Sequence, residues 1–248
     1  TVGRGWTPAN VVRILTGDFT GDGRTDIAAV YADGKLRAWP STGTIANSAL
    51  FVGQGSLHSN LGLTKAAYPR LFTRDADGDG RADLVGQAAD GALRMWRSTG
   101  DLSGPDTAFT GPGARVGAGW TTANISRILT GDFTGDGRDD IAAVYADGRL
   151  RAWPSTGVIA DSALFRGSGS LHDTTFTAAT HPRLLVGDAD RDGRTDVVAH
   201  NADGRLLAYR STGNASGANT LFPPSPRLVG SGRSEERRVG KECRSRWS

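Results

Sequence analysis

Four copies of one acidic loop carry most of the chemistry that this sequence could support. Each copy fits Asp-x-Asp/Thr-x-Asp-Gly-x-x-Asp, and the copies, loops 1 to 4, begin at residues 18, 75, 132 and 188. Oxygen side chains at loop positions 1, 3, 5 and 9 and the carbonyl of position 7 converge when such a loop coils back, and the glycine at position 6 permits the sharp turn. Flexible rings of oxygen ligands suit Ca²⁺. The sequence therefore predicts up to four structural Ca²⁺ sites.

The predicted ligands occupy positions 1, 3, 5, 7 and 9 of each loop, and the four arginines contribute only their backbone carbonyls. They are Asp18, Thr20, Asp22, Arg24 and Asp26; Asp75, Asp77, Asp79, Arg81 and Asp83; Asp132, Thr134, Asp136, Arg138 and Asp140; and Asp188, Asp190, Asp192, Arg194 and Asp196. Position 3 is threonine in loops 1 and 3 and aspartate in loops 2 and 4. We therefore expect loops 2 and 4 to bind Ca²⁺ more tightly.

Two other interpretations of these loops are weaker. Solvated Asp-Gly turns would not need four carboxylates crowded together in every copy. EF-hands place a bidentate glutamate at position 12. The residues found there are Ala29, Gly86, Ala143 and Ala199.

The spacing of the loops indicates a repeat architecture. Successive loops start 57, 57 and 56 residues apart, and a fixed period of this length is typical of solenoids, propellers and arrays. A longer period overlies it, because Gly3–Thr7 returns as Gly117–Thr121, 114 residues later. The chain is therefore two double units.

Short apolar segments around each loop predict an all-β fold. Val11–Thr16 precedes loop 1, and Asp26–Tyr31 and Lys35–Trp39 follow it around an Asp-Gly turn, which favours a hairpin. Ala49–Gly53, Arg115–Gly119 and Ala163–Gly167 are expected to be last strands of their repeats. Four short antiparallel strands per repeat are typical of a β-propeller blade, so we expect four four-stranded blades and few helices.

The run Gly17-Asp-Phe-Thr-Gly-Asp-Gly-Arg-Thr-Asp-Ile-Ala28 resembles the FG-GAP/VCBS-type repeat of integrin α-subunit propellers and of many secreted bacterial proteins. The resemblance covers about residues 1–232, as repeats at about 1–56, 57–114, 115–170 and 171–232. It implies Ca²⁺ between the first and second strands of each blade, and a secreted or cell-surface location. Family propellers usually have about seven blades, which implies that this chain is a fragment of a larger propeller.

Residues 233–248 share nothing with the repeats and resemble the translated read-through of a sequencing adapter. The repeat breaks at Arg233, where the pattern around Trp120 requires tryptophan. A genuine basic tail is the alternative. The whole chain has 29 basic and 26 acidic residues, and the tail has six Lys/Arg and three Glu, so the net charge of +3 belongs to the tail. The repeats are neutral and contain no cysteine, so we expect no nucleic-acid partner.

Three further residue sets have expected roles. Arg13, Arg70, Arg127 and Arg183 each lie five residues before a loop, and we expect them to pair with its carboxylates. Trp39, Trp96, Trp153 and Tyr209 share one repeat position, where packing between blades is favoured over stacking on sugar rings. His58 and His172 are expected at the surface.

The sequence contains no catalytic motif: Gly-x-Ser-x-Gly, His-Glu-x-x-His and the P-loop are all missing. We therefore expect no enzymatic activity. A module that binds carbohydrate or an extracellular protein is the favoured interpretation. An accessory module of a larger secreted hydrolase and a purely structural spacer are the alternatives. No membrane-spanning apolar run is visible, so no membrane insertion is expected.

Overall fold

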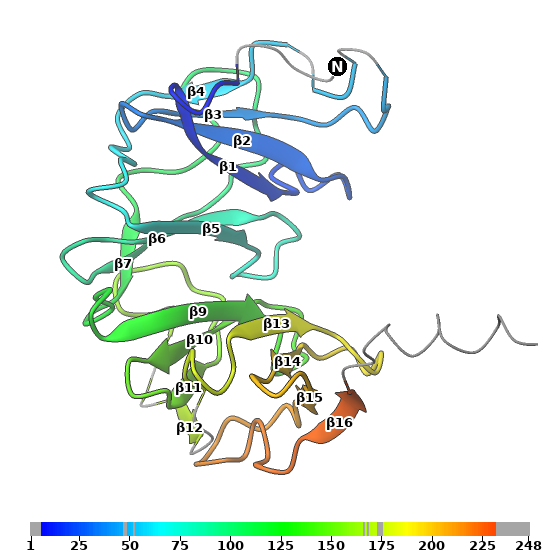
Figure 1. Ribbon diagram of the computed structural model, residues 1–248. Coiled ribbons are helices and arrows are strands. Elements are labelled where there is room, and N and C mark those ends of the chain that lie inside the picture. The colour runs from blue at the N-terminus through cyan, green and yellow to red at the C-terminus, as the bar shows by residue number, and fades with distance from the viewer. Residues whose placement is uncertain are drawn as a thin grey trace, which may run out of the picture.

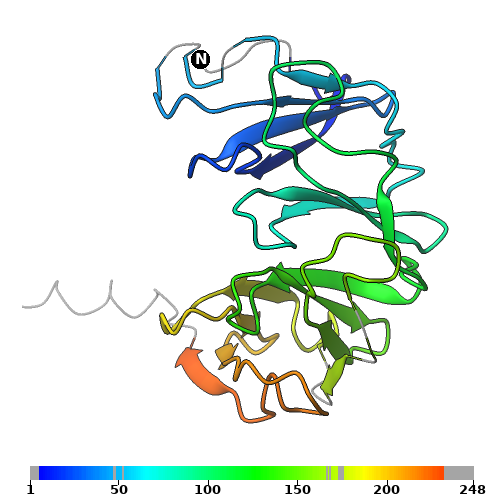
Figure 2. The same ribbon diagram turned by 180° about the vertical axis from the view of Figure 1, so that it is seen from behind.

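The computed structural model describes residues 6–46, 49–51, 53–165, 167, 169–172 and 176–231. These residues form four four-stranded antiparallel sheets, stacked face to face along an arc (Figure 1, Figure 2). No helix occurs among them. The predicted all-β fold with four four-stranded blades is confirmed. The segment 233–248 lies outside the described residues.

Each blade is one consecutive meander, numbered here in chain order. Blade 1 contains β1 (Val11–Gly17), β2 (Asp26–Tyr31), β3 (Leu36–Trp39) and β4 (Ser56–His58). Blade 2 contains β5 (Arg70–Arg74), β6 (Asp83–Gln87), β7 (Leu93–Trp96) and β8 (Ala114–Gly117). Blade 3 contains β9 (Ile125–Gly131), β10 (Asp140–Tyr145), β11 (Leu150–Trp153) and β12 (Ser170–His172). Blade 4 contains β13 (Arg183–Gly187), β14 (Asp196–His200), β15 (Leu206–Tyr209) and β16 (Arg227–Gly230).

The prediction of the last strand is wrong in blades 1 and 3. Ser56–His58 pairs with β3, whereas Phe51 in the predicted segment makes only an isolated bridge to Ser41. Gly55 explains the difference: it has a φ of 63°, and a Cβ there would lie 2.3 Å from the carbonyl oxygen of Ala38. The chain therefore turns onto β3 only after this glycine. The expected strand Arg115–Gly119 overlaps β8.

This shift also overturns the expected exposure of His58 and His172. Both lie on last strands and are buried, and their rings pack against Phe109 and Phe222 at centroid distances of 5.7 and 5.2 Å. β4 and β12 begin at Ser56 and Ser170, which are the last residues of the expected repeats 1–56 and 115–170, and they continue to His58 and His172.

The core consists of three apolar clusters, each between two neighbouring blades. Leu15 and Phe19 of blade 1 meet Leu84 and Trp96 of blade 2. The second cluster joins blades 2 and 3, and the third joins blades 3 and 4. The expected packing role is confirmed for Trp96, Trp153 and Tyr209, which belong to these three clusters. Burial between blades is the main apolar stabilisation of the fold.

The expected pairing of the four arginines that precede the loops with loop carboxylates is wrong. Arg13 donates to the carbonyls of Tyr68 and Pro69 at 2.6 and 3.1 Å. Arg70 and Arg127 make the same contact with backbone carbonyls at the start of the following blade. The guanidinium suits this place because its forked donors can bond two adjacent carbonyls. These arginines join blades, and Arg183 of blade 4 lies exposed.

Candidate metal centres

Each acidic loop connects the first and second strands of its blade. The position-9 aspartate is the first residue of the second strand and is buried in all four blades. In loop 1, both carboxylate oxygens of Asp26 accept backbone amides, Oδ2 from Phe19 and Oδ1 from Ser41. The position-9 side chain therefore fixes the loop to the hairpin that follows.

The position-1 carboxylate organises the turn. Asp18 Oδ1 accepts the amide of Gly21 at 2.7 Å, and Oδ2 accepts the amide of Gly23 at 2.7 Å. Gly23, at position 6, has a φ of 80°, which confirms the need for glycine there. Asp75 and Asp132 receive the same amide bonds in loops 2 and 3. The loops thus coil as their sequence predicts.

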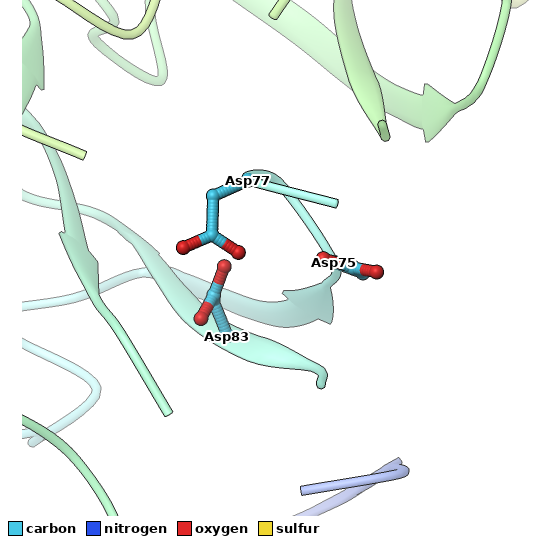
Figure 3. A group of neighbouring side chains, drawn as sticks. All are labelled: Asp75, Asp77 and Asp83. Carbon is cyan, nitrogen blue, oxygen red and sulfur yellow. The ribbon is translucent and has the colours of Figure 1, made fainter. Parts of the chain in front are cut away.

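In loops 2 and 4, the carboxylates of positions 1, 3 and 9 meet. Asp75, Asp77 and Asp83 each offer one oxygen, and these oxygens lie within 4.8 Å of one another. Figure 3 shows the carboxylates of Asp77 and Asp83 facing each other. Asp188, Asp190 and Asp196 form the equivalent group in loop 4. Three carboxylates at this spacing repel one another unless a cation lies between them.

The donor set of loop 2 fits a hard cation. Asp77 Oδ1 is buried and has no hydrogen-bond partner among the described residues. Burial, together with the nearby charge of Asp77, raises the pKa of Asp83 to about 7. Both observations describe carboxylate oxygens without enough positive charge around them. Ca²⁺ would supply that charge through oxygen ligands.

Loops 1 and 3 place threonine where loops 2 and 4 have the third carboxylate. Thr20 Oγ1 lies 3.3 Å from both Asp18 Oδ1 and Asp26 Oδ2, so positions 1, 3 and 9 converge here too. Thr134 Oγ1 in loop 3 is buried without a hydrogen-bond partner among the described residues. Burial raises the pKa of Asp140 to about 7.

The position-5 aspartate, an expected ligand, has an ion-pair partner in every loop. It pairs with the guanidinium of position 7, a side chain for which the sequence indicated no role. These ion pairs are Arg24–Asp22, Arg81–Asp79, Arg138–Asp136 and Arg194–Asp192. The carboxylate groups of loops 2 and 4 consist of positions 1, 3 and 9 and do not include position 5.

Comparison with known families identifies the repeat. The model of the FG-GAP-like repeat matches residues 75–143 and 132–199, which together span half of the chain. The chain belongs to the FG-GAP-like repeat family. No curated protein matches the chain significantly.

Solved structures similar to this FG-GAP-like chain include two lectins. One, from Agrocybe aegerita, is described as recognising non-reducing terminal N-acetylglucosamine; it has a TM-score of 0.58 and 20% identity over 91% of this chain and 54% of its own. The lectin BP39L of Burkholderia pseudomallei has a TM-score of 0.50 and 19% identity over 90% of this chain and 56% of its own. The chain thus spans about half the length of these structures, and the likeness shows the shared fold.

The FG-GAP-like loops of blades 1, 2 and 3 are also bonded to the next blade. The position-1 carbonyls of Asp18, Asp75 and Asp132 accept the amides of Ala82, Asp139 and Thr195 at 2.7 to 2.8 Å. The position-2 carbonyls of Phe19, Ala76 and Phe133 accept the hydroxyls of Ser98, Ser155 and Ser211. A cation that orders a loop would therefore also order the joint between two blades.

Arg97 and Arg210 are site residues that sequence reasoning missed. Arg97 pairs with Asp77 and with Asp79, and Arg210 pairs with Asp190 and Asp192. The FG-GAP-like repeats of blades 1 and 3 have Pro40 and Pro154 at this position. The signal was present in the sequence, because arginine follows the third strand only where position 3 of the loop is aspartate.

Removing both of these arginines is expected to strengthen Ca²⁺ binding at loops 2 and 4. A cation must displace each guanidinium from the position-3 carboxylate, so the Arg97→Ala, Arg210→Ala variant should bind about 3–10-fold more tightly at these loops. Calorimetric titration of Ca²⁺ measures the change. Arg149→Ala with Arg205→Ala removes the same charge from exposed pairs elsewhere and is the control. Unchanged affinity in the first variant would show that the arginines do not oppose the cation.

Proposed function

We propose that this chain is a non-catalytic, Ca²⁺-binding propeller module of a secreted or cell-surface protein, and that it recognises carbohydrate. The acidic loops hold Ca²⁺ as a structural ion, with the position 1, 3 and 9 oxygens as its side-chain ligands. The observation that carries the recognition role is a cavity between blades 1 and 2.

This cavity has a volume of about 420 Å³ and lies at the outer strands of the two blades. His58 and Asn60 line it from blade 1, and Trp96, Asp106 and Phe109 line it from blade 2. A cleft of this size with aromatic walls and a few polar groups is typical of small-ligand sites. Its dimensions suit a monosaccharide or a terminal sugar.

The polar groups of the cavity are held in place. His58 Nε2 accepts the amide of Phe109 at 3.3 Å, and His58 Nδ1 lies 3.5 Å from Asp106 Oδ1. Burial lowers the pKa of His58, so the ring is neutral at pH 7. The Asp106 amide donates to the Leu57 carbonyl at 3.1 Å, which fixes the carboxylate at the rim. Trp96 Nε1 is buried and lacks a hydrogen-bond partner among the described residues.

This arrangement suits a sugar because hydroxyl groups both donate and accept hydrogen bonds. Asp106 offers acceptors and Asn60 offers both kinds of group. The apolar walls suit the carbon-bound face of a pyranose ring. Two structures with the same fold are described as lectins, which supports the same class of ligand.

A glycan array on the whole chain, followed by calorimetry on the best binder, tests the proposal. Asp106→Asn introduces the residue that blade 4 carries at the equivalent position, Asn219, and is expected to weaken binding about 10-fold or more through loss of a charged acceptor. Asp203→Asn, at an exposed turn, is the control. Absence of any bound glycan at millimolar concentration would contradict the proposal, as would equal affinity of Asp106→Asn and the wild type.

The alternatives predict different results. A protein-recognition or adhesion module would bind a protein surface and would show no binding on the glycan array. An accessory module of a larger hydrolase would bind that enzyme's polysaccharide substrate, and a spacer would bind neither. Within the described residues, no helix has the length and apolar character needed to cross a membrane.

A further inference from the structure

The first strands of the four blades lie along the inner side of the arc. Each is an edge strand of its sheet, and β1 contacts β5 as β9 contacts β13. Figure 1 shows these strands toward the inside of the arc, whereas β4, β7 and β12 lie toward its outside. A cavity of about 580 Å³ opens along them, and every residue that lines it, except Pro69, belongs to a first strand. The cavity therefore lies inside the arc and not on its two ends.

Four arginines line this cavity, which we call the arginine cavity, and no aspartate or glutamate is among its lining residues. They are Arg13 of β1, Arg70 and Arg74 of β5, and Arg127 of β9. The rest of the lining is mostly apolar. Positive charge is thus concentrated at one place in a chain whose repeats are neutral as a whole.

The charge of three of these arginines is not compensated. Arg74 has an acidic neighbour, since its Nε lies 4.0 Å from Asp139 Oδ2. Arg13, Arg70 and Arg127 form no ion pair within the described part of the chain and donate instead to neutral backbone carbonyls. Burial lowers the pKa of Arg13 and Arg70, because removal from water penalises the charged guanidinium. An anion in the cavity would offset this penalty.

The acidic loops do not supply the missing negative charge. Each loop follows its first strand, whereas these three arginines stand near the start of that strand. Arg127, for example, precedes Asp132 by five residues, which corresponds to about 16 Å along an extended strand. The three guanidiniums and the loop carboxylates therefore occupy opposite ends of the first strands.

The guanidiniums are held in position without a ligand. Arg70 Nη1 donates to Gln87 Oε1 and to the Ile125 carbonyl, both at 3.0 Å, and Nη2 donates to the Ser126 carbonyl at 2.9 Å. Arg13 keeps one buried nitrogen, Nη1, without a hydrogen-bond partner among the described residues. Side chains that are already immobilised lose little freedom on binding. Planar guanidiniums also match the two oxygens of a carboxylate.

We propose that the arginine cavity binds a small organic anion with two or three carboxylates. Several carboxylates are needed to balance three uncompensated guanidiniums, and charge-assisted hydrogen bonds to carboxylates are strong. The apolar part of the lining suits the carbon body that joins them. The arginine cavity shares no lining residue with the cavity between blades 1 and 2. It is therefore a second site, independent of carbohydrate recognition.

Calorimetric titration of the whole, Ca²⁺-loaded chain with tricarballylate, a tricarboxylate, tests the proposal, with the same Ca²⁺ concentration in both solutions. We expect a dissociation constant of about 0.1–1 mM. Acetate, which has a single carboxylate, should bind at least about 10-fold more weakly. The affinity for tricarballylate should fall with added salt. Absence of tricarballylate binding at about 10 mM would overturn the proposal, as would an equal affinity for acetate.

Ser126 allows the charge of the cavity to be changed without loss of an arginine. It is exposed, lines the cavity and accepts a hydrogen bond from Arg70 through its backbone carbonyl. Ser126→Glu adds a carboxylate beside Arg70 and should weaken tricarballylate binding about 10-fold or more. Ser126→Gln loses the same hydroxyl bonds to Val144 and Tyr145 but adds no charge, so it is the control and should bind about as tightly as the wild type. Equal affinity of the two variants would contradict the proposal.

A second pair of variants tests the arginines themselves. Arg127→Gln removes one guanidinium from the cavity and should weaken tricarballylate binding about 10-fold or more. Arg183→Gln removes the exposed arginine at the same repeat position of blade 4, which does not line the cavity, and should leave the affinity unchanged. Circular dichroism checks the fold of Arg127→Gln, because Arg127 also joins blades 3 and 4; if that variant unfolds, the Ser126 pair decides. An equal loss of affinity in both arginine variants would show that the anion does not bind in this cavity.

Discussion

Adding about 10 mM Ca²⁺ to the chelator-treated protein is expected to raise its melting temperature by more than about 10 °C. Affinities of extracellular calcium modules are about 0.1–1 mM. A site that binds only the folded state contributes about 2.7 kcal/mol at 100 times its dissociation constant. Each kcal/mol shifts the melting temperature of a protein of this size by about 2–4 °C. Two well-filled loops are enough for the expected shift.

The shift should depend on the loop carboxylates. Asp77→Asn with Asp190→Asn removes the position-3 charge from loops 2 and 4, which should reduce the Ca²⁺-induced shift to about half or less of its wild-type size while loops 1 and 3 still respond. Thermal scans with and without Ca²⁺ measure this difference, so a general loss of stability in the variant does not affect the result. Mg²⁺ at the same concentration should have a smaller effect, because it demands a tighter octahedral site. A melting temperature that is the same with and without Ca²⁺ would contradict the metal assignment.

The Ca²⁺-free protein is expected to become less stable as the pH rises from 5.5 to 7.5. Asp83 and Asp140 have folded-state pKa values of about 7, against a usual value of 3.8, because burial penalises their charged forms. The folded state therefore holds protons that the unfolded state has released, and its stability falls as the pH rises toward and through 7. Each carboxylate contributes about 2 kcal/mol over this interval. For the two carboxylates together, the melting temperature should fall by about 8–16 °C.

Ca²⁺ should reverse the sign of this dependence. The bound ion requires deprotonated carboxylates, so protons compete with it and stability in Ca²⁺ should rise with pH over the same interval. Asp83→Asn with Asp140→Asn should flatten the slope of the Ca²⁺-free protein, whatever its absolute stability. Burial also raises the pKa of Asp26, Asp75, Asp139 and Asp196, which change stability in the same direction. Asp33 and Asp203 have pKa values lowered by their hydrogen bonds to Lys35 and Arg205, and they act below this interval. If the melting temperature of the Ca²⁺-free wild type did not change with pH, burial would not keep Asp83 and Asp140 protonated in the folded state.

Local chemistry made the loops and the hairpins predictable. Asp18 and Gly23 act within one loop, and the Asp-Gly turns pair strands that are adjacent in sequence, so residue type and spacing were sufficient. The last strand of blade 1 was misplaced because its pairing with β3 depends on Gly55, where the backbone of one strand passes against another. Gly113 and Gly169 repeat this glycine in blades 2 and 3, but a glycine in the sequence does not by itself show which strand passes against it.

Contacts between blades were the least predictable. Arg13 was expected to bind the loop of its own blade, but its partners, Tyr68 and Pro69, belong to the next blade. The pairing of Arg97 with Asp77 was visible as a difference between odd and even repeats. The ion pair itself could not be inferred from the sequence, because the two residues are separated along the chain and meet only when the third strand returns to the loop.

A calorimetric titration of the metal-stripped chain with Ca²⁺ tests the central claim most directly. The four loops predict four bound ions per chain, in two affinity classes that correspond to threonine or aspartate at position 3. Binding should be complete in the low millimolar range, about 1–5 mM. Absence of bound Ca²⁺ at that concentration would contradict the claim that these loops are metal sites.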